Sequence, residues 1–153
     1  MAIDLINKAQ QDETTKEFLL EQYKMYIEMA DRISQRRASA NSFFISANAA
    51  ILAFATWLGI AGINILLISL AGLSISFFWF FSIRSYSQLN SSKYKVIHEI
   101  ETKFPLRLYE YEWEVLGKGK SFKKYWPLSH IEKLIPFVFI ALYIVLFILN
   151  YKR

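Results

Sequence analysis

The feature that most restricts the fold of this chain is a stretch of 46 residues between Arg37 and Arg84 without a charged side chain. Only a short Gly-Ile-Ala-Gly segment, residues 59–62, interrupts its apolar character. The hydrocarbon layer of a membrane is about 30 Å thick, and a helix rising about 1.5 Å per residue needs roughly 20 apolar residues to cross it. The arms on either side of the glycines, about residues 43–58 and 63–83, are each near that length. The stretch therefore predicts a membrane hairpin.

A second uncharged run, residues 134–151, predicts a third span. Its 18 residues are almost continuously apolar. A buried helix of a soluble protein is the alternative, but that alternative is favoured for shorter runs of about 10 to 14 residues. We therefore predict an all-α integral membrane protein with three transmembrane helices, a hairpin plus a C-terminal span, that carries cytosolic helical extensions.

The length of the chain limits its domain organisation. With 153 residues, many of them in lipid, there is no room for an independent enzyme core, and we expect one membrane domain over residues 1–153. The expected segments are an N-terminal cytosolic helix at 13–41, a first span at 42–60, a second span at 62–83 that continues as a cytosolic helix to about 104, a cytosolic short helix and basic loop at 105–130, and a third span at 132–150.

The placement of the basic residues predicts the orientation in the membrane. Ten of the 18 Lys and Arg residues lie from Arg84 to Lys133, against six acidic residues there, and the turn at 59–62 carries no charge. Lys and Arg accumulate on the cytoplasmic side of membrane proteins, so we predict a multi-pass protein with a cytoplasmic N-terminus. The net charge of +5 is explained by this placement, and no nucleic-acid partner is predicted.

Helical periodicity continues beyond the predicted spans. Apolar and tyrosine positions recur in alternate steps of four and three before the first span, which predicts a helix that packs on another helix; they are Leu19, Tyr23, Tyr26, Ala30 and Ile33. A similar stripe follows the second span and predicts one helix of about 40 residues ended by Pro105; its members are Tyr86, Leu89, Lys93, Ile97, Ile100 and Phe104. For residues 106–116 a strand and a short helix compete, and Gly117 favours the helix.

Small and polar residues inside the spans are the candidates for helix packing. Asn48 lies within the first span, where an unpaired amide is unfavourable and a partner on another helix is expected; the alternative places it on a polar cavity or pore. Small residues permit close approach of helices in lipid, within or between chains. They are Ser42, Ser46, Ala50 and Ala53 in the first span and Ser69, Gly72 and Ser76 in the second.

Charged residues supply two further groups of candidates. The cytosolic ion-pair candidates are Arg32, Arg36 and Arg37 with Glu28, Asp31 or Glu99 of neighbouring helices, and the basic loop contains Lys118, Lys120, Lys123 and Lys124, which we expect to face anionic lipid. No nucleophile with an adjacent base can be identified, and the chain has two histidines and no cysteine. We therefore predict no catalytic residue, no metal, no cofactor and no enzymatic activity.

The segment before the first span carries a resemblance to a known family. Residues 30–37, Ala-Asp-Arg-Ile-Ser-Gln-Arg-Arg, followed by Asn41-Ser42-Phe43-Phe44, resemble the signature of the RipA family of small bacterial membrane proteins. Further similarity lies at Pro105 with Tyr109, at Glu112-Trp113, at residues 116–120, and at Pro127-Leu128 with Ile131-Glu132, so that it covers about residues 21–149. The chain is more loosely similar to two-span membrane effectors of bacterial nucleotide-signalling defence systems. It differs from them in having a third predicted span.

The resemblance to RipA implies a homo-octamer in the bacterial cytoplasmic (inner) membrane, in a family linked to adaptation to stressful or host environments and without an established molecular activity. Two functions follow as hypotheses. The first is a non-enzymatic octameric scaffold whose partners are copies of itself and membrane lipids; other protein partners are unknown. The second is an oligomeric pore, in which Asn48 and Ser46 line the conduit and the basic loop favours anions at its mouth.

Overall fold

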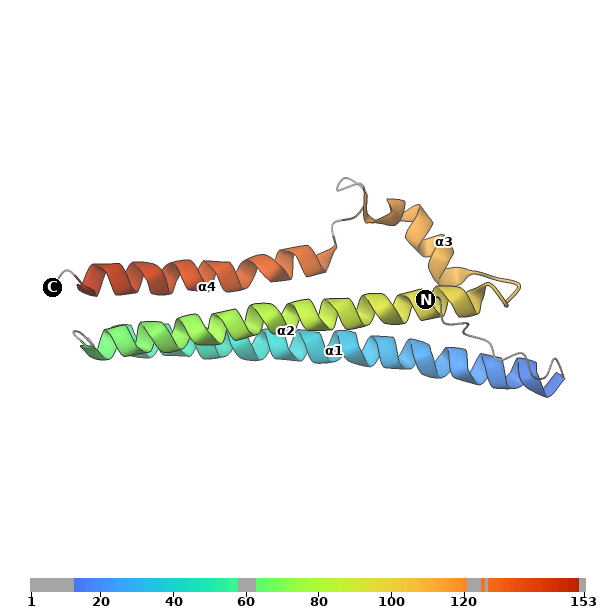
Figure 1. The fold of residues 1–153 in the computed structure, drawn as a ribbon, viewed down its shortest axis with the longest axis horizontal. Helices are drawn as coiled ribbons and strands as arrows, with labels where there is room; N and C mark the ends of the chain where they lie inside the picture. Colours follow the sequence, from blue (N-terminus) through green and yellow to red (C-terminus); the bar gives the residue numbers. More distant parts are fainter. Residues whose placement is uncertain (1–12, 58–62, 121–124, 126, 152–153) are drawn as a thin grey trace, which may run out of the picture. The chain divides into compact units, whose positions relative to one another are not determined.

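The computed structural model describes residues 13–57, 63–120, 125 and 127–151. It contains four α-helices, namely α1 (Glu13–Trp57), α2 (Ile63–Glu101), α3 (Leu108–Val115) and α4 (Leu128–Tyr151), and one 3-10 turn, η1 (Gly117–Gly119). No strand occurs in these ranges. Three of the helices are long and apolar enough to cross a membrane (Figure 1). The chain is thus an all-α membrane protein with three spanning helices, as its uncharged runs predict.

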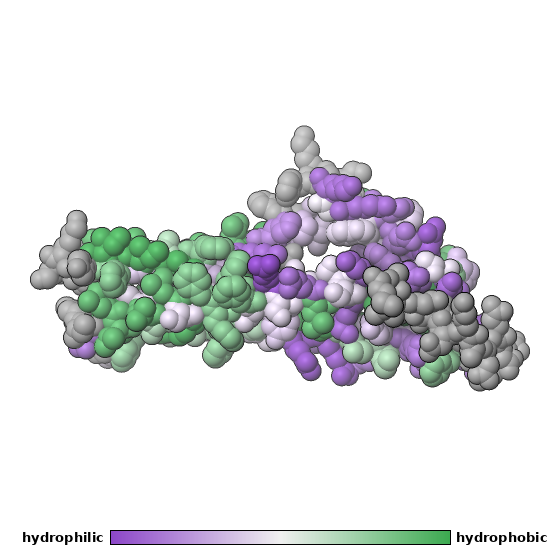
Figure 2. All heavy atoms as spheres, in the orientation of Figure 1, coloured by the Kyte–Doolittle hydropathy of each residue, from purple (hydrophilic) through white to green (hydrophobic). Residues whose placement is uncertain are grey.

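The chain forms two compact units, and α1 and α2 each run through both. The polar unit comprises residues 1–34 and 89–126, and the membrane unit comprises residues 35–88 and 127–153. Figure 2 shows hydrophobic residues gathered over the membrane unit and hydrophilic residues over the polar unit. The predicted turn at 59–62, together with Lys123 and Lys124, lies outside the described residues.

Within each unit α1 and α2 are antiparallel and keep one register. Tyr23 bonds Glu101 and Ser34 bonds Asn90 in the polar unit, so 11 residues along α1 correspond to 11 along α2. In the membrane unit Asn48 bonds Ser76. The number of residues from Ser34 to Asn48 along α1 again equals the number from Asn90 to Ser76 along α2. The pairing therefore has the regularity of a coiled coil.

Burial along α2 follows the same repeat. Its buried or half-buried positions recur in alternate steps of four and three from Ile65 to Ile100, a mean period of 3.5 residues that keeps one seam facing the partner helix. The predicted stripe from Tyr86 to Ile100 is confirmed except at Leu89, which is 49% exposed. Asn90 takes its place because the period of 3.5 turns residue 90 inward.

Proline sets the end of α2 slightly earlier than expected. The helix ends at Glu101, not at about 104, and the next amides form turn bonds, Lys103 N–H to the Ile100 carbonyl and Phe104 N–H to the Glu101 carbonyl. Pro105 has no N–H and disfavours helical geometry at Phe104, which accounts for the difference. The following segment forms α3, the helical alternative, and Gly117 follows it at φ 72°.

Candidate functional site

A buried amide joins α1 to α2 in the membrane unit. The Asn48 side chain is 0% exposed; its Nδ2 donates to the Phe44 carbonyl at 2.8 Å, and its Oδ1 accepts from the Ser76 hydroxyl at 3.2 Å. Ser76 is also fully buried. This supplies the partner on another helix that an amide within a span requires. Both polar atoms of the Asn48 side chain are used inside the protomer.

Helix α4 is held against this cluster by an aromatic ring. Tyr143 is fully buried, and its ring lies directly over Gly72, so that a Cβ at position 72 would overlap the ring. The Tyr143 hydroxyl reaches the Asn48 carbonyl at 3.4 Å. Gly72 is therefore required by the close approach of α2 and α4. Ser69 is buried about one turn away, and its hydroxyl donates to the Ile65 carbonyl.

A second polar contact lies nearer the charged end of the membrane unit. Trp79 is 0% exposed, and its Nε1 donates to the Asn41 Oδ1 at 2.9 Å. The Trp79 ring is stacked at 5.8 Å on Phe44 and lies 6.0 Å from Phe139 of α4. The indole of α2 thus packs against α1 and α4, while its only polar group is satisfied, as burial of tryptophan requires.

One nearly buried ion pair connects α1 with α4. Arg37 Nε lies 3.2 Å from Glu132 Oε2, and the two side chains are 15% and 11% exposed. These atoms are close but lack hydrogen-bond alignment. A pair withdrawn from water in this way contributes little net stability, but removal of one partner leaves the other charge stranded. Glu132 was not among the predicted partners of Arg37.

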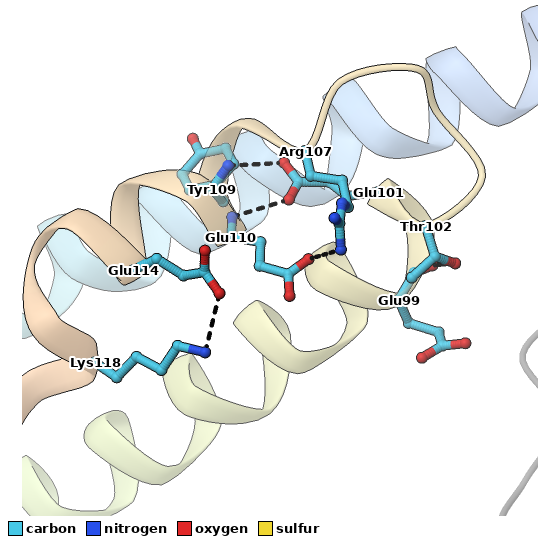
Figure 3. Close-up of polar contacts among 8 residues, drawn as sticks. All are labelled: Glu99, Glu101, Thr102, Arg107, Tyr109, Glu110, Glu114 and Lys118. Atoms are coloured by element: carbon cyan, nitrogen blue, oxygen red, sulfur yellow. Dashed lines mark hydrogen bonds and ion pairs between the residues drawn. The ribbon is translucent and has the colours of Figure 1, made fainter.

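The other predicted ion-pair residues lie on exposed surfaces. Arg32 pairs with Glu28 at 2.7 Å one turn away on the same helix, with both side chains more than half exposed. Arg36 is exposed, and Asp31 is an exposed residue of the polar unit. Glu99 is exposed, and its carboxylate points away from the Glu101 cluster in Figure 3. Surface pairs of this kind contribute about 0 to 1 kcal/mol.

The predicted small residues divide into an inward and an outward set. Ser69, Gly72 and Ser76 of α2 are buried between the helices of the protomer. In contrast, α1 exposes small side chains on its membrane surface; they are Ser42, Ser46, Ala50 and Ala53. Large apolar side chains occupy other exposed positions of α1 as well as those of α2 and α4, including Phe43, Phe54, Leu67, Phe77, Phe81, Val138 and Leu142.

In the polar unit, a single carboxylate joins α1, α2 and α3. Glu101 is 0% exposed and accepts from the Tyr23 hydroxyl at 2.7 Å. It also accepts from the backbone N–H groups of Tyr109 and Glu110 at 2.9 and 3.1 Å (Figure 3). The first N–H groups of a helix have no partner within the helix, and a carboxylate is favoured at that positive end. Glu101 therefore caps α3 from the neighbouring helix.

Tyrosines surround this junction. Burial and the adjacent Glu101 carboxylate raise the pKa of Tyr23, which keeps its hydroxyl protonated as the donor. Burial also raises the pKa values of Tyr94 and Tyr109, whose rings lie 5.8 Å apart. A hollow of about 380 Å³ lies beside them; its lining includes Lys24, Glu28, Asp31, Ser34, Tyr94 and Tyr109.

The basic loop is only partly described. Lys118 adopts the left-handed conformation (φ 54°) between two glycines, and its ammonium pairs with Glu114 at 3.1 Å. Lys120 is exposed. Across the described part of the chain, no three His, Asp or Glu side chains are grouped as metal ligands would be.

Comparison with known proteins identifies the family. The model of the octameric membrane protein family (8xMP) matches residues 20–151. The chain belongs to this family. No curated protein and no solved structure matches the chain. The matched range includes most of both units and every contact described above.

Several contacts of this family member could not be assigned from sequence alone. Glu101 carried one usable signal, since it is an acidic residue next to Ile100 of the predicted stripe and lies shortly before Pro105 and a helix start. The sequence carried no signal for the pairing of Arg37 with Glu132, because 94 residues lie between them and charged residues are ordinary at a membrane boundary. The sequence likewise does not distinguish Tyr143 from the other apolar residues of its span.

Proposed function

We propose that this chain assembles into a homo-octameric, non-enzymatic scaffold in the bacterial cytoplasmic membrane. The description of its family as octameric supports self-assembly. The positive-inside placement of Lys and Arg supports a cytoplasmic N-terminus and a cytoplasmic polar unit. In this proposal the exposed Arg36, Arg84 and Lys120 face anionic lipid headgroups.

The outward small residues of α1 favour contacts between protomers. Lipid-facing positions tolerate large apolar side chains, as α2 and α4 demonstrate, whereas small residues are enriched where helices approach closely. Ser42, Ser46, Ala50 and Ala53 share an exposed side of α1 and have no close helix of the same protomer over them. We assign this side of α1 to packing against an adjacent protomer.

The single observation that favours a scaffold over a pore is the position of Asn48. A pore hypothesis places this amide on a water-filled axis, but the side chain is 0% exposed and its polar atoms bond Ser76 and Phe44. Among the described residues 42–57, the polar side chains that remain exposed on α1 carry small hydroxyls, as Ser42 and Ser46 do. Walls of that composition favour packing over ion conduction.

The test combines mass and ion flux on one preparation. Native mass spectrometry of the purified protein is expected to give eight copies, and liposomes containing it are expected to remain ion-tight. Ser46→Leu is the companion variant, because a bulky residue at an exposed α1 position disturbs protomer packing while Asn48 stays in place. An octamer that conducts ions would overturn the scaffold, and a monomeric wild-type protein would overturn the assembly itself.

A further inference from the structure

Helix α3 has two apolar faces, and only one of them is covered. The inner face contains Tyr109 and Leu116, which are half-buried, and Tyr109 lies against the Tyr94 ring. A second face contains Leu108, Tyr111 and Val115, spaced by three and four residues as one side of a helix requires. Their exposed fractions are 61%, 70% and 56%. Three large apolar side chains gathered on one exposed side of a helix outside the predicted spans indicate a surface that a partner covers.

A hollow accompanies the outer face of α3. Its volume is about 340 Å³, and it is lined by Pro105, Leu106, Arg107, Leu108, Glu110, Tyr111 and Glu114. Leu106 at its edge is 67% exposed. The charged members are already paired, Arg107 with Glu110 at 2.9 Å and Glu114 with Lys118 at 3.1 Å. The hollow therefore combines apolar lining residues with charged residues that are already paired, which suits an apolar side chain.

Apolar side chains of the complementary kind project from α1 in the same unit. Phe18, Met25 and Met29 recur in steps of seven and four, and they are 63%, 51% and 40% exposed. They lie in the charged part of α1, outside the uncharged run, where large exposed apolar residues are not explained by lipid. This second stripe is separate from the seam of Tyr23, Ala30 and Ile33 that faces α2.

The two surfaces lie at the same level along the helices. Glu101 bonds both Tyr23 of α1 and the first amides of α3, so the start of α3 is level with Tyr23. Phe18 and Met25 lie five residues before and two residues after Tyr23, or about 7 and 3 Å along the helix axis. In a ring around the membrane normal, a residue of one copy meets residues of the next copy at equal distance from the membrane.

A closed ring of eight also requires two unlike surfaces on each protomer. The stripe on α1 and the hollow on α3 are unlike and complementary, one projecting and one receding. A membrane surface is a poor alternative partner for α3, because helices that bind membranes are rich in Lys and Arg. Helix α3 carries Glu110, Glu112 and Glu114 and no basic residue.

We propose that the outer face of α3 receives Phe18 and Met25 from α1 of the adjacent copy of this chain. The proposal rests on the octameric assembly above and specifies the contact that closes the ring in the polar unit. Because the α1 stripe and the α3 hollow are unlike surfaces of one protomer, the contact is head-to-tail.

Disulfide cross-linking tests this contact, because the chain contains no cysteine of its own. The double variant Phe18→Cys/Tyr111→Cys is oxidised in membranes and resolved by denaturing electrophoresis. A ladder of covalent species reaching eight copies is expected, since every interface supplies one pair within the reach of about 3.5 to 4.5 Å between Cβ atoms. Either single variant is expected to remain uncross-linked.

The matched control pairs Tyr111→Cys with Leu89→Cys. Leu89 is likewise apolar and 49% exposed, but it lies 12 residues before Glu101 on α2, or about 18 Å along the axis. No ladder is expected from it. Coexpression of the two single variants, Phe18→Cys and Tyr111→Cys, on differently tagged chains is expected to give only dimers that contain both tags.

Native mass spectrometry of the reduced samples separates the two levels of the proposal. Octamers that give no ladder, or that cross-link equally through Leu89→Cys, would overturn the α1–α3 contact and leave the scaffold intact. Monomers from the wild-type chain would overturn the scaffold, and the contact with it. Octamers with a ladder specific to Phe18→Cys/Tyr111→Cys would establish the contact.

Discussion

The α1–α2 pair keeps one register in both units but is held together by different side chains in each. In the membrane unit the seam contains Asn48 with Ser76 and Trp79 with Asn41, all fully or nearly buried. In the polar unit the seam is mainly aliphatic, with Ala30, Ile33, Ile97 and Ile100 buried. Its polar contacts are fewer; they are the bond from Tyr23 to the fully buried Glu101, the long bond between Asn90 and Ser34, and Lys93, whose ammonium is 4.7 Å from the centre of the Tyr26 ring.

This difference follows from the solvent around each unit. In water the burial of aliphatic surface drives helix association, at about 25 cal/mol per Å². In lipid that driving force is absent, so that close packing and hydrogen bonds between helices take its place. The same period of 3.5 residues carries buried isoleucines in both units, including Ile65 and Ile83 in the membrane unit, and there it adds buried glycine, serine and asparagine.

The largest expected effect concerns the nearly buried pair Arg37–Glu132. Arg37→Met leaves Glu132 as an unpaired charge at 11% exposure, and we expect a loss of about 3–5 kcal/mol in the free energy of unfolding. Chemical denaturation in detergent, followed by circular dichroism, measures it. The double variant Arg37→Met/Glu132→Leu is expected to return close to wild-type stability, because no charge remains stranded. Equal losses in the single and double variants would contradict this account.

The next prediction concerns Glu101, which joins α1, α2 and α3 in the polar unit. Glu101→Ala removes the acceptor for Tyr23 and for two amides of α3, and we expect a loss of about 3 kcal/mol. Hydrogen exchange is expected to accelerate in α3 and to stay unchanged in the membrane unit. Glu99→Ala, on the exposed side of the same turn, is the control, with a change within about 0.5 kcal/mol. Protected α3 amides in Glu101→Ala would show that the cap is dispensable.

Close packing in the membrane unit is tested at Gly72. In Gly72→Ala the added Cβ overlaps the buried Tyr143 ring, and we expect a destabilisation of about 1–3 kcal/mol. Tyr143→Leu in the Gly72→Ala background is expected to recover part of the loss, since a smaller side chain makes room. Ala71→Leu is the control, because Ala71 is exposed on the next position. Thermal unfolding of the four proteins in one detergent gives the comparison.

The sequence predicted what depends on local periodicity. The three spanning helices, the length of α2 and the seam from Leu19 to Ile33 all follow from the spacing of apolar residues, which does not require knowledge of distant partners. The predicted partner helix for Asn48 follows from a similarly general rule, because an amide in lipid must be bonded.

What the sequence did not predict depends on which distant residues meet. The register that pairs Ser76 with Asn48, the choice of Glu132 for Arg37 and the ring of Tyr143 over Gly72 are set by tertiary packing. The small residues illustrate the limit well. Composition alone groups Ser46 of α1 with Ser76 of α2, yet one is exposed and the other fully buried.

The smallest expected effects compare the same substitution in the two units. Asn48→Leu removes a hydrogen bond between helices in lipid, and we expect a loss of about 1 kcal/mol. Asn90→Leu in the polar unit is expected to be neutral or slightly stabilising, because its bond to Ser34 is long at 3.4 Å and its buried Oδ1 has no hydrogen-bond partner.

Denaturation of both variants under one set of conditions measures this difference, with Ser76→Ala and Ser34→Ala completing two double-mutant cycles. A coupling energy between Asn48 and Ser76 that exceeds the one between Asn90 and Ser34 would establish that polar contacts contribute more stability in the membrane unit than in the polar unit. Equal couplings would mean that the polar residues of the membrane unit are placed by packing volume alone, and that Gly72 and Tyr143 set its structure.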